Sequence, residues 1–139
     1  MVNVELESGL KFNIHHSTLN IQHFGLRVLS DATQSQITAT RAKIRPFPPW
    51  LRPFLSRGVL AITLGRRVYI AASVAEGEME QLLRHELVHV GQIARLGFVR
   101  FYWRYVSEYI TLRRRGFSSA EAYQRISFEV EAFAAEKIL

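Results

Sequence analysis

The chain has 139 residues, a length that fits one domain with its own hydrophobic core. It contains no cysteine, which excludes disulfide bonds and thiolate-bound metals, so any metal has to be held by nitrogen and oxygen atoms. The 18 Lys and Arg residues outnumber the 12 Asp and Glu residues, giving a net charge of +6. Such a charge fits contact with nucleic acid, anionic lipid or an acidic protein, and equally fits an ordinary solvated surface.

The first residues, MVNVELESGLKF, lack the basic stretch and apolar run of a secretory signal, and no apolar stretch is long enough to span a membrane. We therefore expect a soluble, cytoplasmic protein. Apolar and polar residues alternate over residues 2–6 and predict a strand. The histidines that follow, His15, His16 and His23, lack the spacing of a metal site and are interpreted as surface or hydrogen-bonded core residues.

A proline-rich segment, RAKIRPFPPWLRPFLSRG, occupies residues 41–58 and contains all four prolines. Regular elements tolerate proline poorly, so the segment is predicted to be an ordered loop or lid. The alternative is a simple connector in which Phe47, Trp50 and Phe54 pack on the core. The sequence leaves the role of residues 45–53 open between these two interpretations.

Two β-branched segments, VLAITL and VYIAA, predict a hairpin over about residues 59–72. Gly65, Arg66 and Arg67 lie between them and predict a three-residue loop. Strand-like segments give way to helical periodicity near residue 75. The expected fold class is therefore α+β, with a small antiparallel sheet followed by a helical half.

The helical half is predicted to contain three helical regions. The first begins at Glu76 and ends at Gly97, a natural helix stop. FVRFYWRYVSEYITLRRR predicts a second helix, whose aromatic residues are expected to pack on the core and whose last three arginines suit the negative end of the helix dipole. Ser118 and Glu121 then form an S-x-x-E capping box that opens a third region, with Ser127 as a candidate break.

The strongest chemical signal is LLRHELVHVGQ, which places His85 and His89 four residues apart with Glu86 beside the first. Residues four apart in a helix lie on the same face, so both histidines can bind one metal ion. Glu86 can then reach a water on that ion and act as a general base. The pattern H-E-x-x-H is for this reason typical of zinc peptidases.

A catalytic zinc site has three protein ligands, and no histidine follows His89. The third ligand is therefore expected to be a carboxylate on a later helix. The segment ISFEVEAFAAEKIL offers Glu129, Glu131 and Glu136. Helical geometry alone does not choose between Glu129 and Glu131.

The motif H-E-x-x-H, followed about 40 residues later by E-x-E-A, resembles the gluzincin metallopeptidases. It is also similar to small bacterial H-E-x-x-H domains. These include repressor-cleaving immunity peptidases and the core domain found with contractile injection systems, to which HELVHVGQ is particularly similar. The resemblance covers roughly residues 59–136 and implies a zincin-like fold for the single domain.

In gluzincins the first glutamate of such a segment binds zinc, and a small residue follows three positions later. An Asp or Asn four positions later supports a ligand histidine. The resemblance therefore implies that Glu129 is the third ligand and that Ala132 is the small residue. Phe133 departs from the pattern because it cannot accept a hydrogen bond, which leaves Glu131 as an alternative ligand.

These residues predict a zinc metallopeptidase that hydrolyses peptide bonds of a peptide or protein substrate by means of a metal-activated water. One Zn²⁺ would be held by His85, His89 and Glu129, with Glu86 as the general base. The resemblance also implies that the strand VYIAA could pair with an extended substrate. The oxyanion donor stays unassigned among four tyrosines that are expected to pack on the core, Tyr102, Tyr105, Tyr109 and Tyr123.

Two other hypotheses fit the same sequence. In the first, the zincin fold is retained but is catalytically weak or inactive, and its arginines bind an acidic protein partner or nucleic acid. In the second, the chain is an α+β domain without a metal and the H-E-x-x-H pattern is accidental. Metal content and peptidase activity distinguish the three hypotheses.

Overall fold

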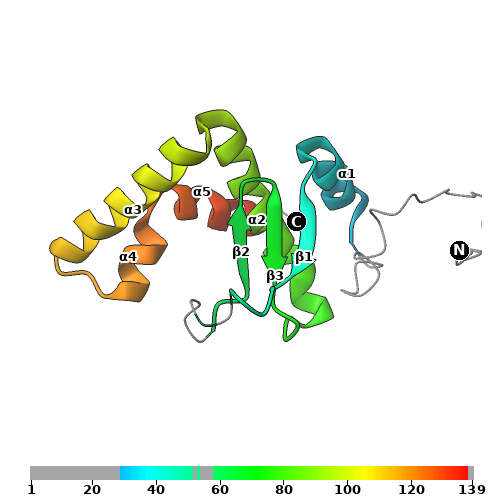
Figure 1. The fold of residues 1–139 in the computed structure, drawn as a ribbon, viewed down its shortest axis with the longest axis horizontal. Coiled ribbons are helices and arrows are strands. Elements are labelled where there is room, and N and C mark those ends of the chain that lie inside the picture. The colour runs from blue at the N-terminus through cyan, green and yellow to red at the C-terminus, as the bar shows by residue number, and fades with distance from the viewer. Residues whose placement is uncertain (1–28, 52, 54–57, 138–139) are drawn as a thin grey trace, which may run out of the picture.

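The computed structural model describes residues 29–51, 53 and 58–137, which form a small sheet and five helices (Figure 1). The elements in chain order are α1 (Asp31–Thr40), β1 (Lys43–Pro46), β2 (Ala61–Leu64), β3 (Arg67–Ile70), α2 (Glu76–Leu96), α3 (Phe98–Arg114), α4 (Ser119–Arg125) and α5 (Ser127–Glu136). The predicted α+β class is confirmed. The strand predicted at residues 2–6, the three early histidines and Phe54 lie outside the described residues.

The sheet is mixed rather than wholly antiparallel, with the strand order β1-β3-β2. β2 pairs with β3 as the predicted hairpin, whereas β1 runs parallel to β3 and places Ile44 opposite Val68. β1 comes from the start of the proline-rich segment, and Pro46 is tolerated there because β1 is an edge strand. β3 has a neighbour on each side, so the prediction that VYIAA pairs with substrate is wrong.

The hairpin turn has two residues, Gly65 and Arg66, instead of the predicted three. Leu64 is paired with Arg67, which is the first residue of β3. Gly65 has φ of +65°, and glycine with positive φ at the first turn position is typical of a type II′ turn. This turn matches the twist of the two strands without a third loop residue.

Helix α1 lies in the half of the chain that was predicted to contain strands. Ser30 is its N-cap and accepts a hydrogen bond from the Thr33 amide. Glu80 on α2 anchors this end of the helix, since its carboxylate accepts from the Ser30 amide at 3.0 Å, from the Ser30 hydroxyl at 2.6 Å and from the Thr33 hydroxyl. Burial opposes the charge, but these bonds and the Arg84 guanidinium lower the pKa of Glu80 to about 2.

The predicted helices of the second half are confirmed. α2 ends at Leu96, and its C-cap is the predicted stop Gly97, which has φ of +84° and directly precedes α3. Ser118 and Glu121 form the complete capping box of α4. The last helical region breaks at Ile126, whose extended backbone separates α4 from α5 just before Ser127.

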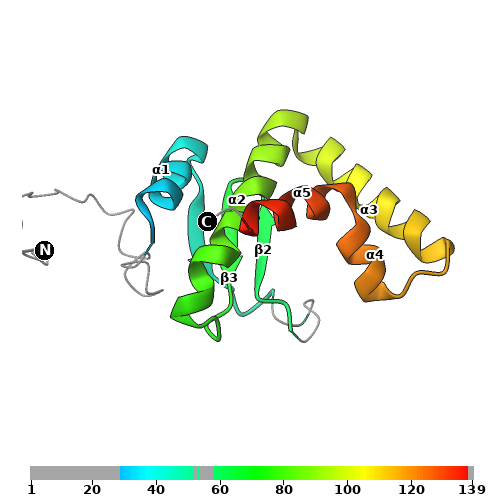
Figure 2. The ribbon, with the colours of Figure 1, turned by 180° about the vertical axis from the view of Figure 1, so that it is seen from behind.

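Helix α2 lies across one face of the sheet, and the other helices of the second half extend to the side opposite α1 (Figures 1 and 2). Two buried hydrophobic clusters hold this arrangement together. The first joins the sheet to α2, and the second joins α2, α3 and α5 around Phe101 and Phe128. In the proline-rich segment, Leu51 is buried whereas Trp50 is 63% exposed, so the prediction that Trp50 packs on the core is wrong.

Among the described residues, no helix is both long and apolar enough to cross a membrane.

Candidate metal centre

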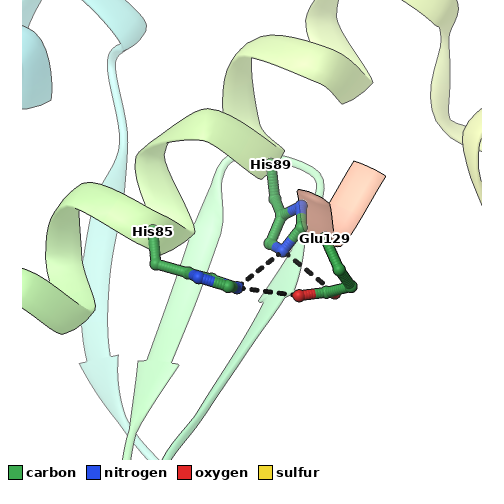
Figure 3. Close-up of side chains that lie close together, drawn as sticks. All are labelled: His85, His89 and Glu129. Atoms are coloured by element: carbon green, nitrogen blue, oxygen red, sulfur yellow. Dashed lines mark hydrogen bonds and ion pairs between the residues drawn. The ribbon is translucent and has the colours of Figure 1, made fainter. Parts of the chain in front are cut away.

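Helices α2 and α5 bring three predicted site residues together (Figure 3). His85 and His89 are one turn apart on α2 and face the first turn of α5, where Glu129 lies. The exposed fractions are 4% for His85, 6% for His89 and 2% for Glu129. The three side chains therefore meet in the interior of the protein, between α2 and α5.

The Nε2 atoms of both histidines point toward the Glu129 carboxylate (Figure 3). His85 Nε2 lies 3.0 Å from Glu129 Oε2, and His89 Nε2 lies 3.2 Å from Glu129 Oε1. The two Nε2 atoms are 3.1 Å apart. Ligand atoms about 2.0–2.1 Å from a tetrahedral zinc lie roughly 3.3 Å from one another, so the observed spacing fits one ion.

Hydrogen bonds at the opposite ring nitrogens determine the tautomer of each histidine. His85 Nδ1 lies 2.7 Å from the Glu136 carboxylate, which can only accept, so His85 donates from Nδ1. Gln92 turns its amide nitrogen to Phe128 O and the Glu131 carboxylate, so its oxygen faces His89 Nδ1 at 2.9 Å. His89 therefore also donates from Nδ1, and in the neutral rings both Nε2 atoms carry lone pairs.

Acceptor atoms consequently converge on one buried point. The two Nε2 lone pairs face a carboxylate. Glu129 Oε2 accepts no hydrogen bond from the residues that the structure describes, although it lies 3.0 Å from His85 Nε2. Buried acceptors without a donor are costly, whereas a cation between them satisfies all three side chains. The donor set of two imidazoles and one carboxylate fits zinc, and it is a set found in catalytic zinc sites.

The charge balance of the centre favours positive charge at the histidines. Burial disfavours a charged imidazole, but the Glu129 carboxylate outweighs it and raises the pKa of both His85 and His89. Burial would also raise the pKa of Glu129, but the two histidines and the Tyr105 hydroxyl lower it. A metal ion at this point would therefore compete with protons for the same two nitrogens, and acid would weaken its binding.

Glu86 is buried beside this group but is held separately. Its Oε2 accepts a hydrogen bond of 2.5 Å from the Thr63 hydroxyl on β2, and the Thr63 carbonyl accepts one from Tyr102. Burial raises the pKa of Glu86, although both histidines act in the opposite direction. A carboxylate with a raised pKa next to a candidate cation site is suited to take up a proton.

Of the two candidate third ligands, the structure brings Glu129 and not Glu131 to the histidines. The Glu131 side chain is 50% exposed and contacts Gln92 and Arg95. Glu136, the third glutamate of this segment, supports His85 from one turn beyond Phe133. Glu136 thus accepts the hydrogen bond from His85 that Phe133 cannot accept. The sequence signal for this role is the spacing, since Glu136 lies seven residues, about two helical turns, after Glu129.

The four tyrosines differ in their surroundings. Tyr105 donates to Glu129 Oε1 at 2.6 Å, and Tyr102 donates to the Thr63 carbonyl. Tyr109 shares a hydrogen bond with Ser119 on the surface. Tyr123 is 40% exposed, and the neighbouring Glu129 contributes, after burial, to raising its pKa.

The partners of the ring nitrogens give a testable prediction. Gln92→Met keeps the side-chain length but leaves His89 Nδ1 without an acceptor, so zinc affinity is expected to fall about 10- to 100-fold. The measurement is competition with a chelating dye at neutral pH. Gln124→Met, an exposed substitution on α4, is the matched control. Equal zinc affinity in the two variants would contradict this supporting role.

The chain was compared with protein families, curated proteins and solved structures. Neither the curated proteins nor the solved structures gave a significant match. The family model of the eCIS core domain matches residues 54–96, a segment that contains the β2–β3 hairpin and all of α2. The resemblance to the core domain of contractile injection systems is therefore confirmed over the hairpin and the H-E-x-x-H helix.

Proposed function

We propose that this protein is a zinc-dependent peptidase, with the metal held by His85, His89 and Glu129. The observation that carries the proposal is the buried convergence of these three side chains at 3.0–3.2 Å. Both imidazoles are fixed with their Nε2 lone pairs toward the same point, which is the arrangement that a metal requires. The match of residues 54–96 to the eCIS core domain also supports the interpretation that the H-E-x-x-H pattern on α2 is not accidental.

A zinc ion bound there would supply Lewis-acid chemistry, polarising a carbonyl oxygen and making water easier to deprotonate. Glu86 would take the proton of the attacking water and return it to the leaving amine. Thr63 orients the Glu86 carboxylate through one oxygen, so the other oxygen remains for proton transfer. Tyr105 holds Glu129 in place and is a positioning residue.

The edge strand β2 is the proposed place for a peptide substrate. It is an edge strand of the sheet and contributes Thr63, whose hydroxyl contacts Glu86 and whose carbonyl accepts a hydrogen bond from Tyr102. An extended peptide added to this edge would be held by main-chain hydrogen bonds, with weak demands on its sequence. The strand predicted from the sequence, VYIAA, cannot do this because it lies in the middle of the sheet.

The burial of the centre also favours a second function, that of a binding module stabilised by a structural metal. His85, Glu86, His89 and Glu129 are each at most 6% exposed, and this degree of burial is typical of a structural metal site as well as of a closed catalytic one. In that case the metal would stabilise a zincin-fold module that binds another macromolecule. The two functions differ in whether peptide bonds are cleaved.

Metal removal tests both functions in one experiment. The purified protein is expected to cleave an unstructured peptide mixture, to lose this activity with a chelator and to regain it when zinc is returned. Thermal unfolding of the same samples reports the contribution of the metal to stability. A chelator that lowers the unfolding temperature of a protein without peptidase activity would favour the module, and a chelator without any effect would contradict both functions.

A further inference from the structure

Helix α3 has apolar side chains on two sides. Its inner side packs on the second hydrophobic cluster through Phe101 and neighbouring tyrosines. Nine large apolar side chains are exposed among the described residues, and five of them lie on this one helix. Four of the five are Val99 (80% exposed), Trp103 (74%), Val106 (51%) and Ile110 (42%).

These four side chains form one continuous face, which we call the outer stripe. Their spacings of four, three and four residues place them within an arc of about 60° on a helix that turns about 100° per residue. α3 forms the edge of the molecule on the side opposite α1, which is visible in both views (Figures 1 and 2). A monomeric protein rarely exposes so concentrated an apolar face without a binding role.

The charges around the outer stripe are almost all positive. Arg100, Arg113 and Arg114 lie on α3, and Arg115 follows directly, whereas Arg104 is paired with Glu108 and lies over the Phe128 ring. The one acidic residue of the helix, Glu108, lies on the side opposite the stripe and accepts hydrogen bonds from the amide and hydroxyl of Ser127. Within the described part of the chain, Arg100, Arg114 and Arg115 form no ion pair.

We propose that the outer stripe docks onto an anionic lipid surface, with α3 lying in the plane of the surface. Aliphatic residues and a tryptophan on one face, flanked by arginines, are the composition of helices that bind such interfaces. Tryptophan favours the boundary between head groups and acyl chains, and each nearby arginine adds attraction to anionic lipid.

Other occupants fit the outer stripe less well. A second copy of the chain would bring two rows of arginines against each other, which like charges oppose. A partner helix is usually received in a groove, whereas the side of a single helix is convex. Nucleic acid would be contacted through a positive centre, but here the centre of the face is apolar and only its flanks are charged.

This docking face is independent of the metal centre. The inner side of α3 reaches the centre through Tyr105, which donates to Glu129, and the outer stripe points away from it. Surface docking and peptidase activity can therefore fail separately. Metal content and peptide cleavage, measured on every stripe variant, keep the two results apart.

Vesicle sedimentation tests the proposal with the whole protein. The parent is expected to sediment with phosphatidylcholine vesicles that contain phosphatidylserine, and not with phosphatidylcholine alone. A double variant, Trp103→Ser with Val106→Ser, is expected to bind roughly tenfold or more weakly because it loses apolar burial. The matched control, Trp50→Ser with Val130→Ser, replaces one exposed tryptophan and one exposed valine outside the stripe and should bind as the parent does.

Charge is tested by Arg100→Gln with Arg114→Gln, for which roughly fivefold weaker binding per arginine is expected. The chain has two tryptophans, so the variants Trp50→Phe and Trp103→Phe each leave one as a fluorescent reporter. Emission from Trp103 should shift to shorter wavelength on anionic vesicles, and emission from Trp50 should not.

Four results would overturn the proposal. They are a parent that does not bind, equal binding to neutral vesicles, full binding by the stripe variant, and Trp103 emission that is already blue-shifted without vesicles. A concentration-dependent dimer that the stripe variant abolishes would assign the face to a second copy instead.

Discussion

Replacing Glu86 with glutamine is expected to slow peptide hydrolysis by about 10²- to 10⁴-fold while the metal stays bound. Glu86 is not one of the three converging side chains, and its hydrogen-bonded partner is Thr63 on β2. Glutamine has the same shape and can still accept from the Thr63 hydroxyl, but it cannot take up a proton at neutral pH. The loss should therefore appear in the reaction rate and not in metal content.

The folded structure should tolerate Glu86→Gln well. Burial raises the pKa of Glu86, which means that the interior disfavours its charged form. A neutral amide avoids this cost, so the free energy of unfolding is expected to stay the same or to increase. The measurements are kcat/KM on a peptide, zinc per chain by elemental analysis, and a denaturant titration. Glu76→Gln, an exposed substitution at the start of α2, is the control. A zinc-loaded Glu86→Gln protein as active as the parent would rule out Glu86 as the base.

The helical half could be predicted from the sequence because its signals are local. Apolar residues recur with helical spacing along α2, Gly97 ends it, and Ser118 with Glu121 opens α4. Each of these signals lies within a few residues of the feature that it predicts. The position of H-E-x-x-H inside a helix, and hence the shared face of His85 and His89, followed from the same local pattern.

The first half was harder to predict because its structure depends on distant contacts. Helix α1 has the sequence DATQSQITAT and buries only Thr33, so it shows almost no apolar periodicity. Its N-terminal end is hydrogen-bonded to Glu80, which lies 50 positions beyond Ser30. The Ser30 cap and the following Asp31 were the local signals that could have indicated a helix start. β1 likewise exists because β3 offers a parallel partner, and that pairing cannot be read from KIRP alone.

The surroundings of the candidate metal centre were also hard to predict from the sequence, because they depend on contacts between helices. The resemblance to gluzincins implied an Asp or Asn at the position of Phe133, and helical spacing alone did not single out Glu136 as its replacement. In the folded chain Glu136 approaches His85 from the next turn of α5, and Gln92 holds His89 from α2 itself. Which carboxylate meets which imidazole depends on how α5 lies against α2, a tertiary arrangement that helical spacing does not determine.

The second large effect is expected for substitution of Glu129, the proposed third ligand. Glu129→Ala should abolish stoichiometric zinc binding, because it removes the carboxylate that both Nε2 atoms face. The loss in affinity should exceed the roughly 10- to 100-fold that an outer partner such as Gln92 contributes. Elemental analysis of zinc per chain in the parent and the variant is the measurement. The substitution also leaves the Tyr105 hydroxyl without its acceptor, so some loss of stability should accompany the loss of metal.

Glu131→Ala is the matched control, since it makes the same substitution two positions away in the same helix. The Glu131 side chain is half-exposed, and its contacts among the described residues are Gln92 and Arg95, so the zinc content should stay close to that of the parent. Zinc retained in Glu129→Ala and lost in Glu131→Ala would mean that α5 presents its other face to the histidines. Equal loss in both variants would instead point to a general disturbance of α5, which thermal unfolding would reveal. Only selective loss in Glu129→Ala agrees with a centre in which the carboxylate of Glu129 completes the pair of imidazoles.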